Sequence, residues 1–179
     1  MKFTAQVALV CLAAGAYAGP VIQRNLSTIK QELVKIQDGI DKLDQAAKNV
    51  KGNPGVVIAS ADALIHTIVT STATVQGTSP VTIEDAVKLL GPVQDLVKHG
   101  KTLHQDFVNE RSDIAKAGQC KTTREKIGSI KDEASKCIDV IVSKVEEKAR
   151  SIARNEANKV IQELNEAVAD FGPDKCRDA

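Results

Sequence analysis

The stretch NLSTIKQELVKIQDGIDKLDQAAKNVK, residues 25–51, carries the most regular pattern in the chain. Its apolar residues recur at alternating intervals of three and four positions: Leu26, Ile29, Leu33, Ile36, Ile40, Leu43, Ala47 and Val50. That interval places them on one face of an amphipathic α-helix, and the charged residues between them lie on the opposite face. An apolar helix face is stable only against other apolar surface, so this stretch predicts a helix packed in a larger core.

The same helical interval continues through most of the chain. Residues 53–76 carry apolar side chains three and four apart, although their Thr and β-branched content makes a strand the competing prediction. A third segment starts at Thr82 and is predicted to break or kink at Gly91-Pro92. Beyond that break, apolar residues share a helix face as far as Ile114.

The last third of the chain predicts a helical hairpin. No Gly or Pro interrupts residues 129–171. A single helix from Thr122 to Phe171 would be about 75 Å long at 1.5 Å per residue, whereas a compact domain of this size has a radius of gyration of about 15 Å. We therefore expect a turn near residues 147–152. The predicted fold is an all-α bundle of about five helices that ends in this hairpin, built as a single domain from residues 25–179.

Composition excludes several classes of function. The chain has 179 residues with 24 basic and 23 acidic side chains, so it lacks the basic excess of a nucleic-acid-binding protein. Aromatic residues make up 2% of it, which leaves few platforms for stacking bases or sugar rings. Charged residues make up 26%, too many for a protein that spans a membrane several times. These values favour an aliphatic, helical protein with no nucleic-acid partner.

Residues 1–18 have the features of a secretory signal peptide. Lys2 precedes an apolar run that is too short to span a membrane comfortably and that ends in the small-x-small motif AYA, residues 16–18. Residues 19–24 would then be a spacer or a short propeptide, and the mature chain would have no transmembrane segment. The polar tail FGPDKCRDA offers no signal for a GPI anchor. We expect a secreted protein, extracellular or in a cell wall, with a candidate N-glycosylation motif at Asn25.

Three cysteines remain once the predicted signal peptide is removed. Cys120, Cys137 and Cys176 can pair in three ways. Cys137 falls on the apolar face of its helix, as expected of a buried free thiol. Cys120 and Cys176 flank the predicted hairpin at similar distances from its turn, so we favour a disulfide between them. The alternative is a dimer linked through an unpaired cysteine.

No side-chain pattern points to catalysis. His66, His99 and His104 are not spaced with cysteines or carboxylates as metal ligands are, so we expect them at solvated or helix-end positions. Glycine-rich phosphate loops and the HExxH and GxSxG motifs are absent. We therefore expect neither an enzyme nor a cofactor or metal site.

Two stretches carry a resemblance to a known family: IDKLDQAAKNVKG, residues 40–52, and TIEDAVKLLGPVQDLVKHGKTLHQDFVNERSDIAKAG, residues 82–118. Together with the signal peptide and the Thr/Ser-rich segment between the two stretches, they resemble the secreted fungal family of hydrophobic surface binding protein A and antigenic cell wall galactomannoproteins. The resemblance covers most of residues 23–118. It implies a mannosylated all-α domain in the wall or medium that binds lipids or hydrophobic surfaces, with cell-wall polysaccharide as a further candidate partner. The three mature cysteines and the charged tail depart from the simplest members.

The apolar faces and the resemblance together predict that the bundle binds a long-chain lipid in its interior. Because these faces carry medium-sized aliphatic side chains and almost no aromatic ones, they can leave an elongated space between helices. The candidate lipid-lining residues are Leu64, Ile68, Leu90, Val93, Leu96, Leu103, Phe107, Ile130 and Ile141. Lys98 and Lys101 are the candidates to hold a carboxylate head group. Two alternatives stay open: the apolar faces pack fully on each other, or the protein is a secreted helical effector or inhibitor that binds a protein partner.

Overall fold

The computed structural model describes residues 18–51 and 53–179. The predicted signal peptide therefore lies outside the described residues, except for Ala18. The elements in chain order are α2 (Ala18–Ala47), α3 (Pro54–Gln76), α4 (Ile83–Val87), α5 (Leu90–Asn109), α6 (Arg111–Lys116), α7 (Cys120–Lys144), the 3-10 helix η1 (Glu147–Ala149) and α8 (Arg150–Asp170). Because α2 starts at Ala18, residues 19–24, predicted as a spacer, are helical.

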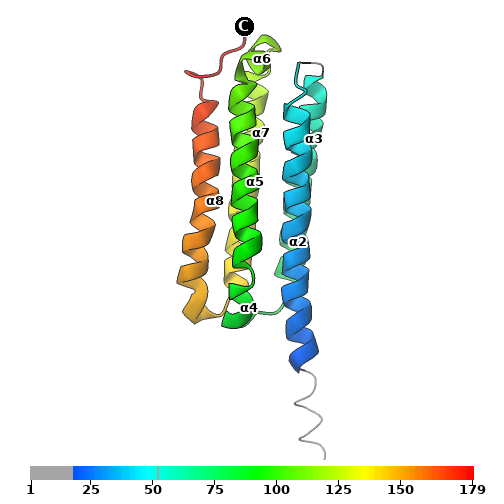
Figure 1. Cartoon of the computed structure of the whole chain (residues 1–179), viewed down its shortest axis with the longest axis vertical. Helices are drawn as coiled ribbons and strands as arrows, with labels where there is room; N and C mark the ends of the chain where they lie inside the picture. The colour runs from blue at the N-terminus through cyan, green and yellow to red at the C-terminus, as the bar shows by residue number, and fades with distance from the viewer. Residues whose placement is uncertain (1–17, 52) are drawn as a thin grey trace, which may run out of the picture.

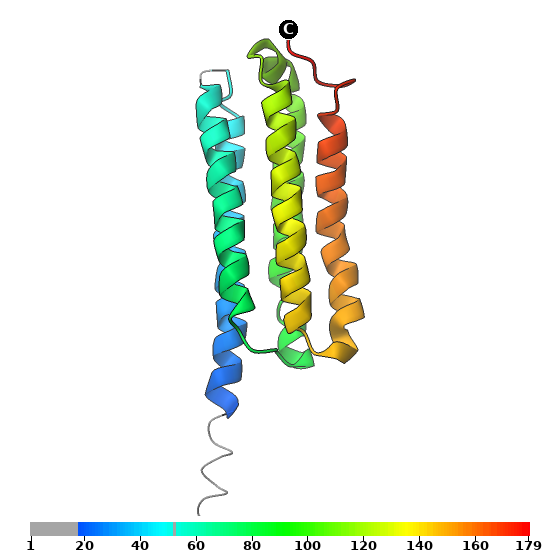
Figure 2. The ribbon, with the colours of Figure 1, turned by 180° about the vertical axis from the view of Figure 1, so that it is seen from behind.

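The five long helices of the described residues form a closed ring. Each lies beside two others, in the order α2, α3, α7, α8, α5 and back to α2. Figure 1 shows α8, α5 and α2 from left to right, with α7 behind α5 and α3 behind α2. Figure 2 shows α3 and α7 in front. The predicted all-α class and the C-terminal hairpin, formed by α7 and α8, are confirmed.

The regular apolar face of α2 is its packing surface. Leu33 and Leu43 on this face are buried, and α2 packs against α3 and α5. The contact with α3 is close at Gly39, where a Cβ atom would lie 2.9 Å from Cδ1 of Leu64. The interval of three and four therefore predicted correctly which side of this helix meets its neighbours.

One polar group interrupts the apolar contact between α2 and α3. The carboxylate of Glu32 is buried, but Ser71 donates to it at 2.8 Å and Lys35 at 2.7 Å. Both carboxylate oxygens thus have hydrogen-bond partners, and these bonds offset the free-energy cost of removing the Glu32 carboxylate from water.

The break predicted at Gly91-Pro92 lies one turn earlier in the structure. At Lys88 and Leu89, between α4 and α5, the backbone forms a turn with i→i−3 hydrogen bonds in place of the α-helical i→i−4 bonds. Pro92 belongs to the first turn of α5, where its missing N–H costs no hydrogen bond. The proline therefore sits at the start of a helix and does not kink one.

The turn predicted near residues 147–152 is present, a few residues earlier. α7 ends at Lys144, η1 follows, and α8 begins at Arg150. The Val81 N–H donates to the Lys144 carbonyl at 2.7 Å, which ties the turn to the segment before α4. The apolar pattern runs through this turn without interruption. The turn was therefore predicted from the excessive length of a single helix over residues 122–171, and not from the pattern.

Helix α3 resolves the choice between helix and strand for residues 53–76 in favour of the helix. Within the described residues, it is also the one helix long and apolar enough to cross a membrane by length and composition. In the structure α3 lies between α2 and α7, and its buried residues include Val57, Leu64 and Ile68. Core helices of soluble proteins meet the same length and composition criteria.

Candidate functional site

The ring of helices surrounds an elongated cavity. The space open to the centre of a water-sized sphere is about 200 Å³. All five long helices contribute side chains to its wall, and most of these side chains are aliphatic. Along α5 the lining residues run from Leu90 to Phe107, about 26 Å at 1.5 Å per residue. A cavity of this length and chemistry suits an elongated apolar ligand.

The structure brings together every residue predicted to line a lipid site. The cavity wall includes Leu64, Ile68, Leu90, Val93, Leu96, Leu103, Phe107, Ile130 and Ile141. The prediction omits α2 and α8, although Leu43 of α2 and Leu164 of α8 also line the cavity. Contact of these side chains with a lipid stays a prediction.

Many lining side chains are only half-buried, although they belong to the apolar faces. This group includes Ile40, Leu90, Leu96, Leu103, Ile130 and Ile141. Leu64 and Ile68 of α3 are instead almost fully buried. Side chains around an empty space lose packing contacts on that side, so methylene groups of a ligand would restore contacts that the protein itself does not make.

Two phenylalanines line the cavity near the C-terminal end of α8. Phe107 of α5 and Phe171 meet edge to face, with ring centroids 6.0 Å apart. Phe171 is completely buried. They are the only aromatic side chains within residues 18–51 and 53–179, so the rest of the wall is shaped by smaller side chains.

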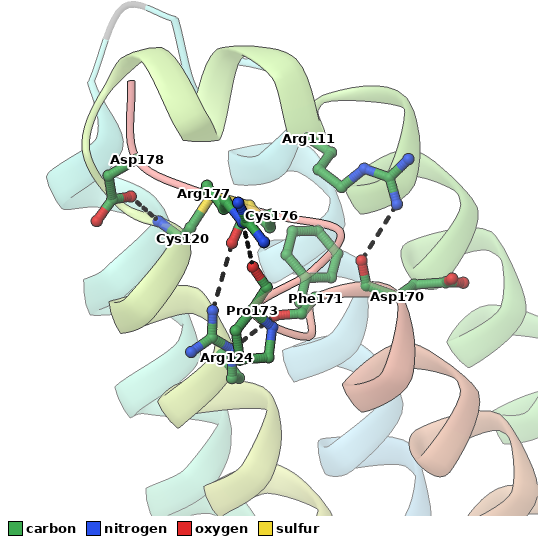
Figure 3. The surroundings of a disulfide bond; sticks show 9 residues. All are labelled: Arg111, Cys120, Arg124, Asp170, Phe171, Pro173, Cys176, Arg177 and Asp178. Atoms are coloured by element: carbon green, nitrogen blue, oxygen red, sulfur yellow. Dashed lines mark hydrogen bonds between the residues drawn. A yellow bond between two sulfur atoms is a disulfide. The ribbon is translucent and has the colours of Figure 1, made fainter.

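A disulfide fastens the chain beyond Phe171 over this end (Figure 3). It joins Cys120 to Cys176, with Cα atoms 5.4 Å apart, which is the pairing favoured from the sequence. Asp178 accepts a hydrogen bond at 2.8 Å from the Cys120 N–H at the start of α7. Arg124 donates to the carbonyls of Phe171 at 2.7 Å and Cys176 at 3.4 Å. The charged tail is therefore held against the end of the bundle at which Phe171 lines the cavity.

The unpaired cysteine, Cys137, is buried and lines the cavity. Burial raises the pKa of its thiol, and a hydrogen bond with Thr72 opposes that rise only in part. At neutral pH the thiol therefore stays protonated and weakly nucleophilic.

Histidines of α5 connect this helix to both of its neighbours. His99 Nδ1 contacts the Asp41 carboxylate of α2, and His104 Nε2 lies 3.0 Å from Oδ2 of Asp170 at the end of α8. The Lys175 ammonium, together with His104, lowers the pKa of the Asp170 carboxyl group. Within the described ranges, no group of three or more His, Cys, Asp or Glu side chains is placed to hold a metal ion.

Sequence reasoning missed the few polar residues of the cavity wall. They are His104, Thr123, Lys126, Glu156 and Glu163. A signal exists for two of them, because Thr123 and Lys126 each lie four positions before an apolar residue that lines the cavity from α7, Ile127 and Ile130. Polar residues at such positions interrupt an apolar face and mark places where the wall can bind a polar group.

The other predicted site residues lie away from the cavity wall. Lys98 and Lys101 of α5 are exposed and are not among the lining residues, and the Lys101 ammonium lies 3.2 Å from Oε1 of Glu163. Asn25 lies in α2, and its Nδ2 is buried without a hydrogen-bond partner among the described residues. A glycan is attached through that atom, so glycosylation at Asn25 stays a prediction that requires another side-chain conformation.

The fold and the cavity define the class of helical bundles with a continuous aliphatic interior. The chain belongs to the hydrophobic surface binding protein A family, whose model matches residues 26–143. It is 30% identical to cell wall mannoprotein 1 of Aspergillus flavus over 156 residues, which is 87% of this chain and 57% of that protein. It is 25% identical to cell wall mannoprotein 1 of Talaromyces marneffei over 96% of this chain and 39% of that protein. The chain thus spans only part of the length of these curated relatives.

Solved structures share this fold. Ligand binding domain 2 of the Penicillium marneffei MP1 protein, complexed with multiple arachidonic acids, matches with a TM-score of 0.77 and 19% identity, over 82% of this chain and 95% of that chain. AFMP4P in complex with palmitic acid matches with a TM-score of 0.75 and 16% identity, over 82% of this chain and 99% of that one. At these identities the likeness shows a common arrangement of helices.

Proposed function

We propose that this protein is a secreted, cell-wall-associated mannoprotein that binds a long-chain lipid, above all a fatty acid, in the cavity of its helical ring. The observation that carries the proposal is the aliphatic wall, which follows the length of α5 from Leu90 to Phe107. No catalytic step is assigned to the site. Membership of the family supports contact with hydrophobic surfaces, and the curated relatives support a place in the cell wall.

The length of the cavity supports an acyl chain as the ligand. The hydrocarbon core of a bilayer, two acyl chains deep, is about 30 Å thick, so one chain needs about 15 Å. The cavity wall along α5 is longer than this, about 26 Å at 1.5 Å per residue. The MP1 domain and AFMP4P, whose helices are arranged in the same way, were solved with arachidonic and palmitic acid.

The energy of burial is sufficient for useful affinity. Each buried methylene contributes about 0.8 kcal/mol, so ten of them contribute roughly 8 kcal/mol before the cost of association. That cost is at least about 4 kcal/mol, so ten buried methylenes leave at most about 4 kcal/mol, which is millimolar affinity. The fourteen methylenes of palmitic acid would contribute roughly 11 kcal/mol and leave at most about 7 kcal/mol, which approaches micromolar affinity, and a polar contact would strengthen it.

Titration with palmitic acid tests the proposal. We expect saturable binding that displaces a fluorescent fatty acid. Absence of saturable binding, together with absence of adsorption to hydrophobic beads, would contradict the proposal and would favour the alternative of a protein partner.

The thiol of Cys137 tests whether the ligand occupies the cavity. Because Cys137 lines the cavity, saturating palmitic acid is expected to slow its alkylation by a small maleimide at least tenfold. The measurement is mass spectrometry of the peptide that contains Cys137, with the reaction in denaturant as the control for reagent quality. Equal alkylation rates with and without palmitic acid would place the ligand elsewhere.

A further inference from the structure

The charged groups of the cavity wall are divided between two helices. Lys126 of α7 is the one Lys or Arg among the described lining residues. The acidic lining residues, Glu156 and Glu163, both belong to α8. A carboxylate ligand is attracted to the Lys126 ammonium and repelled by the carboxylates of Glu156 and Glu163.

The present partner of Lys126 does not prevent it from binding a ligand. Its ammonium is hydrogen-bonded to Asp62 of α3, whose side chain is 53% exposed. An ion pair this exposed contributes little to stability, so the ammonium can turn to or share a second carboxylate at small cost. The Lys126 side chain itself is 30% exposed, so it joins the cavity wall to the solvent.

A second donor lies one turn before Lys126. Thr123 is three positions earlier on α7 and also lines the cavity. Residues three apart on a helix lie on the same side, so the Thr123 hydroxyl and the Lys126 ammonium can serve one head group.

The α8 side of the cavity presents no Lys or Arg among the described lining residues, and the basic side chain that lines it there, His104, already contacts Asp170 at 3.0 Å and Glu163 at 4.0 Å. Glu163 is held by Lys101 at 3.2 Å, and Glu156 by Lys159 at 2.7 Å. These two lysines neutralise the carboxylates from outside and do not line the cavity. A ligand carboxylate on this side would meet acidic groups whose counter-ions already have partners.

The wall beyond Lys126 leaves room for the tail of the ligand. Lining residues of α7 continue to Val142, and Val145 follows the helix, about 28 Å from Lys126 at 1.5 Å per residue. Those of α7 between Lys126 and Val142 are apolar or, at Cys137, a protonated thiol. An acyl chain that starts at Lys126 therefore extends toward the α4 end without crossing a charged residue of α7.

We propose that Lys126, with Thr123, holds the carboxylate of a bound fatty acid, and that the acyl chain points from there toward the α4 end of the ring. This assignment rests on the proposed fatty-acid binding, and it replaces Lys98 and Lys101 as the head-group residues. The contact between the Lys126 ammonium and the carboxylate makes the site selective for a fatty acid over a neutral lipid with the same tail.

The test compares palmitic acid with hexadecanol, which has the same tail and no charge, by displacement of a fluorescent fatty acid from the full chain. We expect the wild-type protein to bind the acid about tenfold more tightly than the alcohol. In Lys126→Met, which keeps the apolar stem, this preference should disappear while the affinity for the alcohol is unchanged. Lys126→Arg should restore it. Lys121→Met is the matched control, because Lys121 is also on α7 and paired with an acidic residue but does not line the cavity.

The outcomes separate the two proposals. If the wild-type protein binds neither palmitic acid nor hexadecanol, the proposed function fails and this assignment fails with it. If it binds both equally, or if Lys126→Met keeps the preference for the acid, lipid binding stands and the assignment to Lys126 is wrong. Loss of the preference in Lys98→Met or Lys101→Met, with Lys126→Met unchanged, would place the head group at α5.

Discussion

Replacing Gly100 by leucine is expected to weaken palmitic acid binding about 100-fold without harming the fold. Gly100 lines the cavity from α5, and a Cβ atom at this position would have no neighbouring atom within 4 Å. A leucine side chain would therefore enter the empty space and displace about four methylene groups of the ligand. At about 0.8 kcal/mol for each methylene, the loss is about 3 kcal/mol, which corresponds to roughly 100-fold in affinity.

Gly128→Leu provides the matched control. Gly128 is also inside a long helix, α7, and a Cβ atom there would also meet open space, but this residue does not line the cavity. Both substitutions remove a glycine from a helix and should raise stability by up to about 1 kcal/mol. Thermal unfolding and titration of both variants then separate the effects. Unchanged affinity in Gly100→Leu would show that the ligand does not occupy the space beside α5.

The double substitution Cys120→Ser/Cys176→Ser is expected to remove about 4 kcal/mol from the free energy of unfolding. The bond closes a loop with a sequence separation of 56, and in the chain-entropy model a loop of that size is worth about 4 kcal/mol. For a domain of this size, such a loss lowers the midpoint of thermal unfolding by roughly 8–16 °C.

The alanine pair Cys120→Ala/Cys176→Ala controls for the buried hydroxyl groups that serine introduces. Similar losses in the two pairs would attribute the effect to the cross-link. A loss below about 1 kcal/mol would contradict the expected size. Peptide mapping without reduction checks the bond itself, and a link between Cys120 and Cys137 would contradict both this pairing and the hairpin argument.

The sequence predicts which side chains face inward but not whether they meet. Leu64 and Ile130 both follow the helical interval, yet Leu64 is 1% exposed while Ile130 is half-buried at the cavity. The difference arises because five helices in a ring hold some apolar faces apart, and ring closure depends on contacts between distant segments. Periodicity describes one helix at a time, so it carries no information about that separation.

The polar features differ in how far a local pattern indicates them. Lys126 interrupts an apolar face, and the spacing of residues along α7 is a local signal that could have indicated it. The bond from the Cys120 N–H to Asp178 joins residues 58 positions apart and depends on where the hairpin brings the tail. No local pattern of the tail shows that it caps the first turn of α7.

The order of the helices in the ring has a consequence for how a ligand enters. If α5 moves away, the other long helices remain joined in the sequence α2, α3, α7 and α8. The helix α5 is also separated from α4 and α6 by short turns, before Leu90 and after Asn109. Phe107 is its one buried residue. Such a segment can open locally at a free energy below that of global unfolding. We therefore expect backbone amides of α5 to exchange with deuterium faster than those of α3, and bound palmitic acid to slow that exchange.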